Sequence, residues 1–158
     1  MPYIAAHRAT ARDWARRFWQ GSHDHRGTID APGRVLTLVP IPNALCEGRV
    51  FGIAAENMEQ TLIDLDHREK NGYERQNLIV QTESLGAIEA LTYIAPKNNI
   101  AWLGEANTCE IAEQIICAHG PSGSNKDYVL ELHSALQNDA IDDEHVNAIA
   151  QRLKCMSD

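Results

Sequence analysis

The order of secondary-structure signals along the chain constrains its fold more than any other feature. Short runs rich in β-branched residues and bounded by Gly, Pro or Asn predict strands. These runs all lie before residue 97 and read RVLTLVP (34–40), GRVFGIAA (48–55), NLIVQTE (77–83) and EALTYIAP (89–96). Helical patterns dominate the rest of the chain. Strands followed by helices favour an α+β domain with a mostly antiparallel sheet over alternating βαβ units.

Helices are predicted where a candidate N-cap precedes an apolar stripe at helical spacing. Such caps stand at Asn57, Asn107, Ser124 and Asp142, and Gly72 can end the first helix. The corresponding stripes are Met58, Leu62 and Leu65, then Ile111 and Ile115, then Tyr128, Leu132 and Leu136, and finally Val146, Ile149 and Leu153.

The stretch RFWQGSHDHRGTIDAPGRV, residues 17–35, gathers many hydrogen-bonding groups in one short loop. Residues 13–19, at its start, fit a helical stripe and also alternate, and we predict a strand that leads into the loop. Either a ligand or a tight turn held by internal hydrogen bonds explains Gln20, Ser22 and Arg26. The sequence alone does not separate these two explanations.

Chain length and net charge limit the classes of function that the protein can have. A chain of 158 residues fits a single domain, expected to cover 1–158. Its 14 Lys and Arg stand against 22 Asp and Glu, giving a net charge of −8, which disfavours nucleic acid and anionic membranes as partners. Without an apolar stretch of about 18 residues or a signal-peptide centre, the chain is expected to be cytoplasmic. Four scattered cysteines predict neither a disulfide framework nor a zinc site.

One carboxylate breaks the helical pattern. The stripe of Met58, Leu62 and Leu65 continues to Glu69, in LDHREKNGY. Partial burial and the negative end of the helix dipole would both disfavour the charged form of this carboxyl, which suits a general base or acid. Arg68 points about 100° away around a helix, so we expect it not to neutralise Glu69. The alternative is that the helix frays and Glu69 lies in water.

Two further polar residues stand at marked positions. Arg34 follows Pro32 and Gly33 at the head of a strand, where it can pin a carboxylate with two hydrogen bonds or form a salt bridge with Asp24 or Asp30. Tyr128 lies on an apolar stripe, where a tyrosine is usually a core residue whose hydroxyl has found a partner.

Other site chemistries find little support. His23, Asp24 and His25 offer too few ligands for a metal centre, since no further His or Cys falls at a matching spacing. The sequence also contains no G-x-S-x-G, P-loop or G-x-G-x-x-G motif. Serine-hydrolase, nucleotide and dinucleotide chemistry are therefore not indicated.

Several stretches together resemble a known family. RRFWQGSHDHRG, PGRVLTLV, LDHREKNGY, ALTYIAP with WLG, and IAEQI with AHGPSGSNKDYVLEL are similar to motifs of the ChaC family of glutathione-specific γ-glutamylcyclotransferases, in the family's order, from about Arg16 to Leu132. The resemblance implies a small mixed β-barrel with flanking helices, and older descriptions call such proteins cation transport regulators. It also implies that glutathione is the small-molecule substrate, cleaved to 5-oxoproline and Cys-Gly without a cofactor.

The resemblance assigns roles to individual residues. The family's catalytic glutamate stands in its R-E…G-Y motif, which here contains Glu69. By the same resemblance, the substrate pocket is expected to involve five residues. These are Gln20, Gly21, Ser22, Arg34 and Tyr128.

The sequence departs from the family at one place. The family begins with a strand ending in a Tyr-Gly-Ser-Leu loop that cradles the γ-glutamyl group, and this chain contains no such tetrapeptide. The sequence therefore predicts an N-terminally shortened domain whose first strand is missing. The alternative function is a catalytically weak or inactive homologue that binds a γ-glutamyl ligand or a protein.

Overall fold

The computed structural model describes residues 3–156 of the chain. The chain divides into two compact units: the first contains the residues through Ala15 and residues 39–96, and the second contains residues 16–38 and those from Lys97 onward. Each unit is described by itself below. The expectation of one domain over 1–158 stays a prediction.

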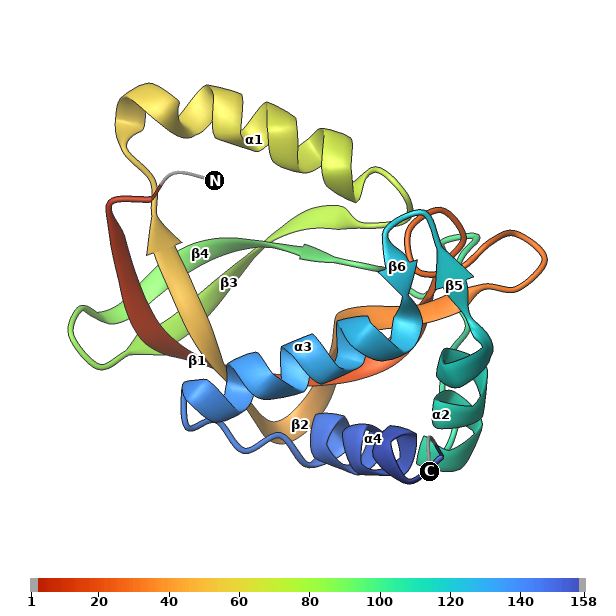
Figure 1. The fold of residues 1–158 in the computed structure, drawn as a ribbon. Coiled ribbons are helices and arrows are strands. Elements are labelled where there is room, and N and C mark those ends of the chain that lie inside the picture. The colour runs from red at the N-terminus through yellow and green to blue at the C-terminus, as the bar shows by residue number, and fades with distance from the viewer. Residues whose placement is uncertain (1–2, 157–158) are drawn as a thin grey trace. The chain divides into compact units, whose positions relative to one another are not determined.

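Long strands and one hairpin build the sheet (Figure 1). The strands β1 (Ala5–Ser22), β2 (Gly33–Gly52), β3 (Glu74–Thr82) and β4 (Gly86–Ile94) are ordered β2-β1-β3-β4. β3 pairs antiparallel with both β1 and β4. Each predicted run contributes to a strand, although two of the runs belong to one strand, and the α+β class with an antiparallel sheet is confirmed. The pairings of the described residues do not show closure into a barrel, so the barrel stays a prediction.

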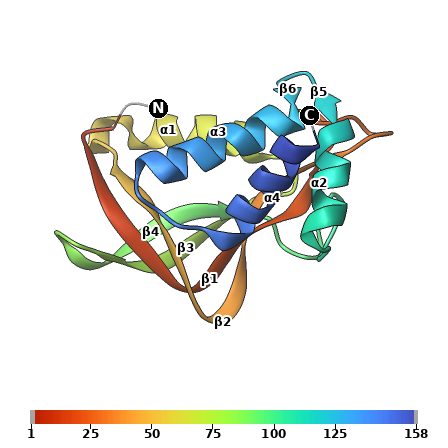
Figure 2. The ribbon, with the colours of Figure 1, turned by 60° about the horizontal axis from the view of Figure 1, so that its bottom comes forward.

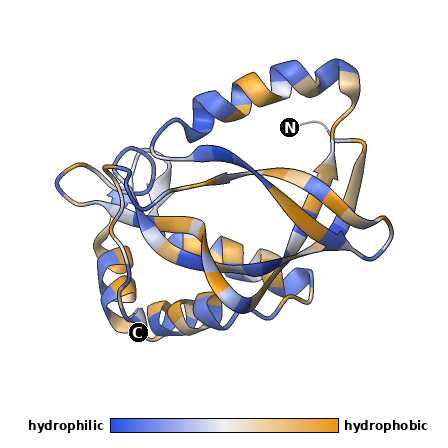
Figure 3. Ribbon diagram, turned by 180° about the vertical axis from the view of Figure 1, so that it is seen from behind, coloured by the Kyte–Doolittle hydropathy of each residue, from blue (hydrophilic) through white to orange (hydrophobic). Residues whose placement is uncertain are grey.

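The sheet has one buried and one exposed face in the first unit. Along β3, Leu78, Val80 and Thr82 are buried, whereas Ile79 and Gln81 between them are exposed. This is the alternation that a strand with one covered face requires. Figure 3 shows the corresponding change of hydropathy along the strands.

β2 joins two runs that the sequence separated. Residues 34–40 and 48–55 were expected to be distinct strands, but β2 continues from Gly33 through Gly52 and stops before residue 55. Asn43 lies within it at a φ of 66° and donates its backbone N–H to Asp13 Oδ1 at 2.7 Å. Because Asn tolerates positive φ, the chain can bend there without leaving the sheet.

α1 (Ala55–Glu69) begins earlier than predicted. Its N-cap is Ala54, whose side chain makes no capping hydrogen bond, so the expected cap at Asn57 is wrong. The N-cap therefore lies three residues earlier than expected, and the helix gains residues 55–57, of which Ala55 and Glu56 are good helix formers. The helix ends as predicted just before Gly72, which has a φ of 97°.

Three helices and a short hairpin complete the second unit (Figure 2). They are α2 (Thr108–Cys117), β5 (His119–Gly120), β6 (Gly123–Ser124), α3 (Asn125–Asn138) and α4 (Glu144–Cys155). Asn107 forms the predicted capping box of α2, and the Ser124 side chain caps α3. Asp143 caps α4 instead of Asp142, one residue later than expected.

An apolar core fills the second unit. Phe18 at the end of β1 is fully buried and belongs to the same cluster as the inner faces of α2, α3 and α4. The fully buried members of that cluster on the helices are Ile111, Ala112, Ile115, Val129, Val146, Ile149, Ala150 and Leu153. Among the described residues, every helix is too short or too polar to cross a lipid bilayer.

Candidate active site

Glu69 is the last residue of α1. Its side chain is 23% exposed, compared with 65% for Arg68 beside it. Glu69 is thus partly covered, neither frayed into water nor fully enclosed. The helix continues through it because Tyr73 donates its backbone N–H to the Glu69 carbonyl at 3.3 Å.

The expectation that Arg68 leaves Glu69 alone is wrong. Arg68 Nε donates to Glu69 Oε1 at 2.8 Å. A long arginine side chain at the end of a helix can fold back to its neighbour, which the angle between two Cβ directions does not reveal. The contact is largely exposed, and such pairs contribute little to stability.

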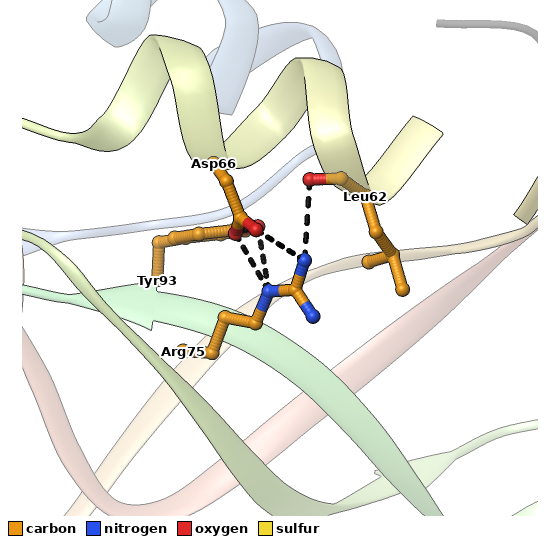
Figure 4. A network of polar contacts seen from close by, with 4 residues as sticks. All are labelled: Leu62, Asp66, Arg75 and Tyr93. Carbon is orange, nitrogen blue, oxygen red and sulfur yellow. Dashed lines mark hydrogen bonds and ion pairs between the residues drawn. The ribbon is translucent and has the colours of Figure 1, made fainter. Parts of the chain in front are cut away.

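A polar network that the sequence did not predict lies one turn before Glu69 (Figure 4). The Asp66 carboxylate on α1 accepts hydrogen bonds from Arg75 Nε at 2.6 Å and from the Tyr93 hydroxyl at 2.6 Å. Hydrogen bonds from Arg75 and then Tyr93 lower the pKa of Asp66. Burial, with the hydrogen bond to Asp66, raises the pKa of Tyr93. The three residues stand 9 and 18 positions apart in sequence, so no local motif links them.

Gln20 and Ser22 are engaged within the second unit. The side-chain amides of Gln20 and Asn99 donate to each other at 3.1 and 3.0 Å, and Gln20 is fully buried. Ser22 Oγ accepts the backbone N–H of Arg26 at 2.9 Å. The Ser22 contact is internal to the loop, as the tight-turn explanation requires, whereas the Gln20 contact joins the end of β1 to Asn99, 79 positions away.

Glycine permits close approach of two backbone segments at the start of this loop. Gly21 donates its backbone N–H to the Ala101 carbonyl at 2.8 Å, and a Cβ at Gly21 would lie 2.7 Å from that oxygen. Any larger residue would therefore push the two segments apart. Gly21 sets the distance between the end of β1 and the segment around Ala101.

Arg34 is buried, and its Nε and Nη1 donate to amide and main-chain oxygens. Its guanidinium donates to Gln114 Oε1 at 2.7 Å and to the carbonyls of Phe18 and Gly104 at 2.9 and 3.1 Å. It does not form the salt bridge with Asp24 or Asp30 that the sequence left open. Burial lowers the pKa of Arg34, and Glu110 partly opposes this by raising it.

Asn125 and Tyr128 connect α3 to β2. The Asn125 side chain accepts the backbone N–H of Arg34 at 2.7 Å and donates to the Arg34 carbonyl at 2.8 Å, a pairing that the sequence did not predict. The Tyr128 hydroxyl accepts the backbone N–H of Leu36 at 3.4 Å, so this hydroxyl has the partner expected of a buried tyrosine. The Arg26 guanidinium lies 5.4 Å from the centre of the Tyr128 ring.

The histidines of the loop do not gather as metal ligands. His25 Nε2 is 3.7 Å from Asp24 Oδ2, and His25 Nδ1 lies 3.1 Å from Ser122 Oγ. Over residues 3–156, no cluster of three or more His, Cys, Asp or Glu could hold a metal ion.

The predicted site residues therefore fall into two groups. Glu69 belongs to the first unit, and the other five belong to the second. Within the second unit, the loop residues, Arg34 and Tyr128 are held by contacts to neighbouring backbone and amide groups. The assignment of these six residues to a site stays a prediction, and Asp66, Arg75, Tyr93 and Asn125, whose contacts the structure adds, carry no signal that a single sequence reveals.

Comparison with known proteins places the chain in a family. The ChaC-like protein family model matches residues 1–156. Gamma-glutamylcyclotransferase 2-3 of Arabidopsis thaliana is 37% identical over 90% of this chain and 76% of its own. Glutathione-specific gamma-glutamylcyclotransferase 1 of Danio rerio is 34% identical over the same shares. The crystal structure of the yeast γ-glutamylcyclotransferase specific to glutathione superposes with a TM-score of 0.88 at 28% identity, covering 98% of this chain and 91% of that one. The chain belongs to the ChaC-like family.

Proposed function

We propose that this protein is a glutathione-specific γ-glutamylcyclotransferase that cleaves glutathione to 5-oxoproline and Cys-Gly. The observation that carries the proposal is the family match over residues 1–156. Relatives at 34% and 33% identity from Danio rerio and Homo sapiens are named for this activity, and the yeast enzyme of the same specificity shares the fold. The single carboxylate at the end of α1 fits the reaction, which needs one group to move a proton.

The reaction is an intramolecular cyclisation. The α-amine of the γ-glutamyl residue attacks its own γ-carbonyl carbon, a C–N bond forms, and a tetrahedral oxyanion results. The bond to the cysteinyl nitrogen then breaks and that nitrogen takes up a proton. No water, metal or organic cofactor takes part. Holding the substrate in the attacking pose supplies much of the rate, because oriented intramolecular reactions reach effective molarities of about 10⁵ M or more.

Glu69 is the proposed proton carrier. As a carboxylate it accepts a proton from the α-ammonium, and as a carboxylic acid it gives that proton to the departing nitrogen. The attacking nitrogen loses its second proton as the lactam forms, and the departing amine takes up this proton, so that Cys-Gly leaves as an ammonium. Before the reaction, Glu69 Oε1 accepts the hydrogen bond and ion pair from Arg68 Nε at 2.8 Å. The proton transferred from the substrate must then loosen this ion pair, since a neutral carboxyl binds a guanidinium less strongly.

Gln20, Gly21, Ser22, Arg34 and Tyr128 are proposed to act on binding by shaping the loop that meets the substrate. Their contacts support this form of the proposal, because the side chains of Gln20 and Arg34 are buried and already bonded to protein groups. We further propose that glutathione is the small-molecule partner and that nucleic acid and membranes are not partners. The proposed location is the cytoplasm.

The test is release of 5-oxoproline from glutathione by the 158-residue chain and by Glu69→Gln. The variant keeps the shape of the side chain but carries no transferable proton, so kcat should fall by about 10² to 10⁴-fold. Glu59→Gln, on the same helix and exposed, is the matched control and should retain full activity. Equal rates for wild type and Glu69→Gln would exclude Glu69 as the proton carrier.

The same assay distinguishes this proposal from two other hypotheses, a binding module and a metal-dependent enzyme. A chain that turns over no glutathione but melts at a higher temperature in its presence is a binding module. Turnover that stops when a chelator is added would replace the proposal by a metal-dependent reaction. Because the chain contains no Tyr-Gly-Ser-Leu, turnover would also show that cyclisation proceeds without that tetrapeptide.

A further inference from the structure

The end of α1 combines limited apolar packing with polar contacts. Thr61 is the buried residue of this helix, its stripe residues Leu62 and Leu65 are partly buried, and Met58 and Ile63 are each 54% exposed. An amphipathic helix normally gains most of its stability by burying one face. Because this face is only partly buried, polar contacts can contribute to the position of the last turns of α1.

The Asp66, Arg75 and Tyr93 network joins these turns to the sheet (Figure 4). Arg75 donates hydrogen bonds to the Asp66 carboxylate from both Nε and Nη2, and Nη2 also donates to the Leu62 carbonyl at 3.3 Å. Arg75 and Tyr93 are direct partners in the β3 and β4 register, and the Tyr93 hydroxyl reaches the same carboxylate. One turn of α1 is thus tied to two adjacent strands at one point.

The contact between Asp66 and Arg75 joins the two ends of a short segment that contains Glu69. Asp66 and Arg75 are separated by nine positions, and α1 ends, turns at Gly72 and enters β3 between them. Glu69 stands three residues after Asp66, on the neighbouring position of the same helix face. Fixing both ends of this segment limits the directions in which the Glu69 carboxyl can point.

We infer that Asp66, Arg75 and Tyr93 are positioning residues for Glu69, holding the segment 66–75 so that its carboxyl meets the substrate in one orientation. The inference rests on the proposed function. The network touches no reacting atom and acts only through Glu69. Bidentate pairing of an arginine with a carboxylate suits this task, because its two parallel hydrogen bonds fix an angle as well as a distance.

The energetics agree with a role in orientation. Asp66 and Arg75 are 49% and 41% exposed, and exposed ion pairs stabilise a fold only slightly. A small displacement of a catalytic group nevertheless costs a large factor in rate, about 10²-fold for 1 Å. Loss of the network should therefore reduce kcat far more than it reduces the melting temperature.

The test compares Asp66→Asn and Tyr93→Phe with Glu89→Gln. Glu89 accepts a hydrogen bond from Asn77 at 2.6 Å, across the same two strands and on the same face, but this pair does not reach α1. Asp66→Asn should lower kcat about 10 to 100-fold and Tyr93→Phe about 3 to 10-fold, with KM within about twofold. The double variant should lose less than the product of the two factors, because both residues hold one carboxylate. Glu89→Gln should match wild type.

Hydrogen exchange gives a readout that does not depend on turnover. In Asp66→Asn, backbone amides of residues 66–75 should exchange faster, while those of α2 should not change. Normal kcat in Asp66→Asn, or an equal loss in Glu89→Gln, would overturn the inference while leaving the proposed function intact. A wild-type chain with no turnover would instead overturn the proposed function, and the inference would fall with it.

Discussion

The two units hold their helices by different means. In the second unit, α4 buries Val146, Ile149 and Leu153 completely in an apolar cluster. In the first unit, the buried residue of α1 is Thr61, and the exposed Asp66, Arg75 and Tyr93 network ties its end to the sheet. An apolar core resists changes of pH and salt, whereas a polar tie determines orientation at little gain in stability. We therefore expect substitutions on the helix that carries Glu69 to cost less stability than substitutions on the buried face of α4.

The largest expected effect compares one apolar side chain from each unit. Phe18→Ala removes a fully buried ring from the core of the second unit and should lower the free energy of unfolding by about 3 to 5 kcal/mol. Ile63→Ala removes a side chain from α1 that is 54% exposed and should lower it by less than about 1 kcal/mol. Urea denaturation of both variants measures the difference. Similar losses would show that α1 contributes a core of its own.

A smaller effect arises from a partly buried histidine that packs against the core of the second unit. His145 stacks on Phe18 with ring centroids 5.7 Å apart, and its Nε2 accepts the Phe18 backbone N–H at 3.2 Å. Burial, reinforced by Arg17 and opposed by Asp143, lowers the pKa of His145 to about 4. Protonation would also destroy the acceptor that Phe18 requires.

The sign of the pH dependence follows from that lowered pKa. Between about pH 6.5 and pH 4 the unfolded chain binds a proton at His145 that the folded chain does not, so stability falls as pH falls through this window. At pH 4.5 the loss from this residue should be about 2 kcal/mol. His145→Gln retains an acceptor but does not titrate, so its stability should fall less between pH 7 and pH 4.5. Parallel curves for the two proteins would contradict this assignment.

Much of the fold followed from local signals in the sequence. The caps Asn107 and Ser124 act through contacts within three residues, and the stripe of α4 follows a regular spacing. Gly72 likewise ends α1 where expected, because a positive φ is a property of one residue. Signals of this kind depend on the nearest neighbours in the chain and need no knowledge of the tertiary structure.

The parts that could not be predicted depend on residues far apart in the sequence. Arg34 donates hydrogen bonds to Gln114 and to main-chain carbonyls instead of to a carboxylate. Asn125 pairs with the backbone of Arg34, which lies 91 positions away in the sequence. Arg68 turned toward Glu69 because a flexible side chain is not bound to its helical angle. Glu69 was singled out as a site candidate because it interrupts the apolar stripe of the predicted helix. Asp66, Arg75 and Tyr93 interrupt no such pattern.

The smallest expected effect concerns the uncapped start of α1. Ala54 occupies the N-cap with φ −61° and ψ 140°, a conformation that a serine also adopts, and it offers no acceptor to the first free N–H groups of the helix. Ala54→Ser should supply one and raise the free energy of unfolding by about 0.5 to 1 kcal/mol. Asn57→Ser is the matched control, because residue 57 lies inside the helix and gains no capping contact. The added stability arises at the end of α1 opposite Glu69, so kcat should not change in Ala54→Ser. A fall in kcat would mean that the whole helix, and not only the segment 66–75, sets the position of Glu69.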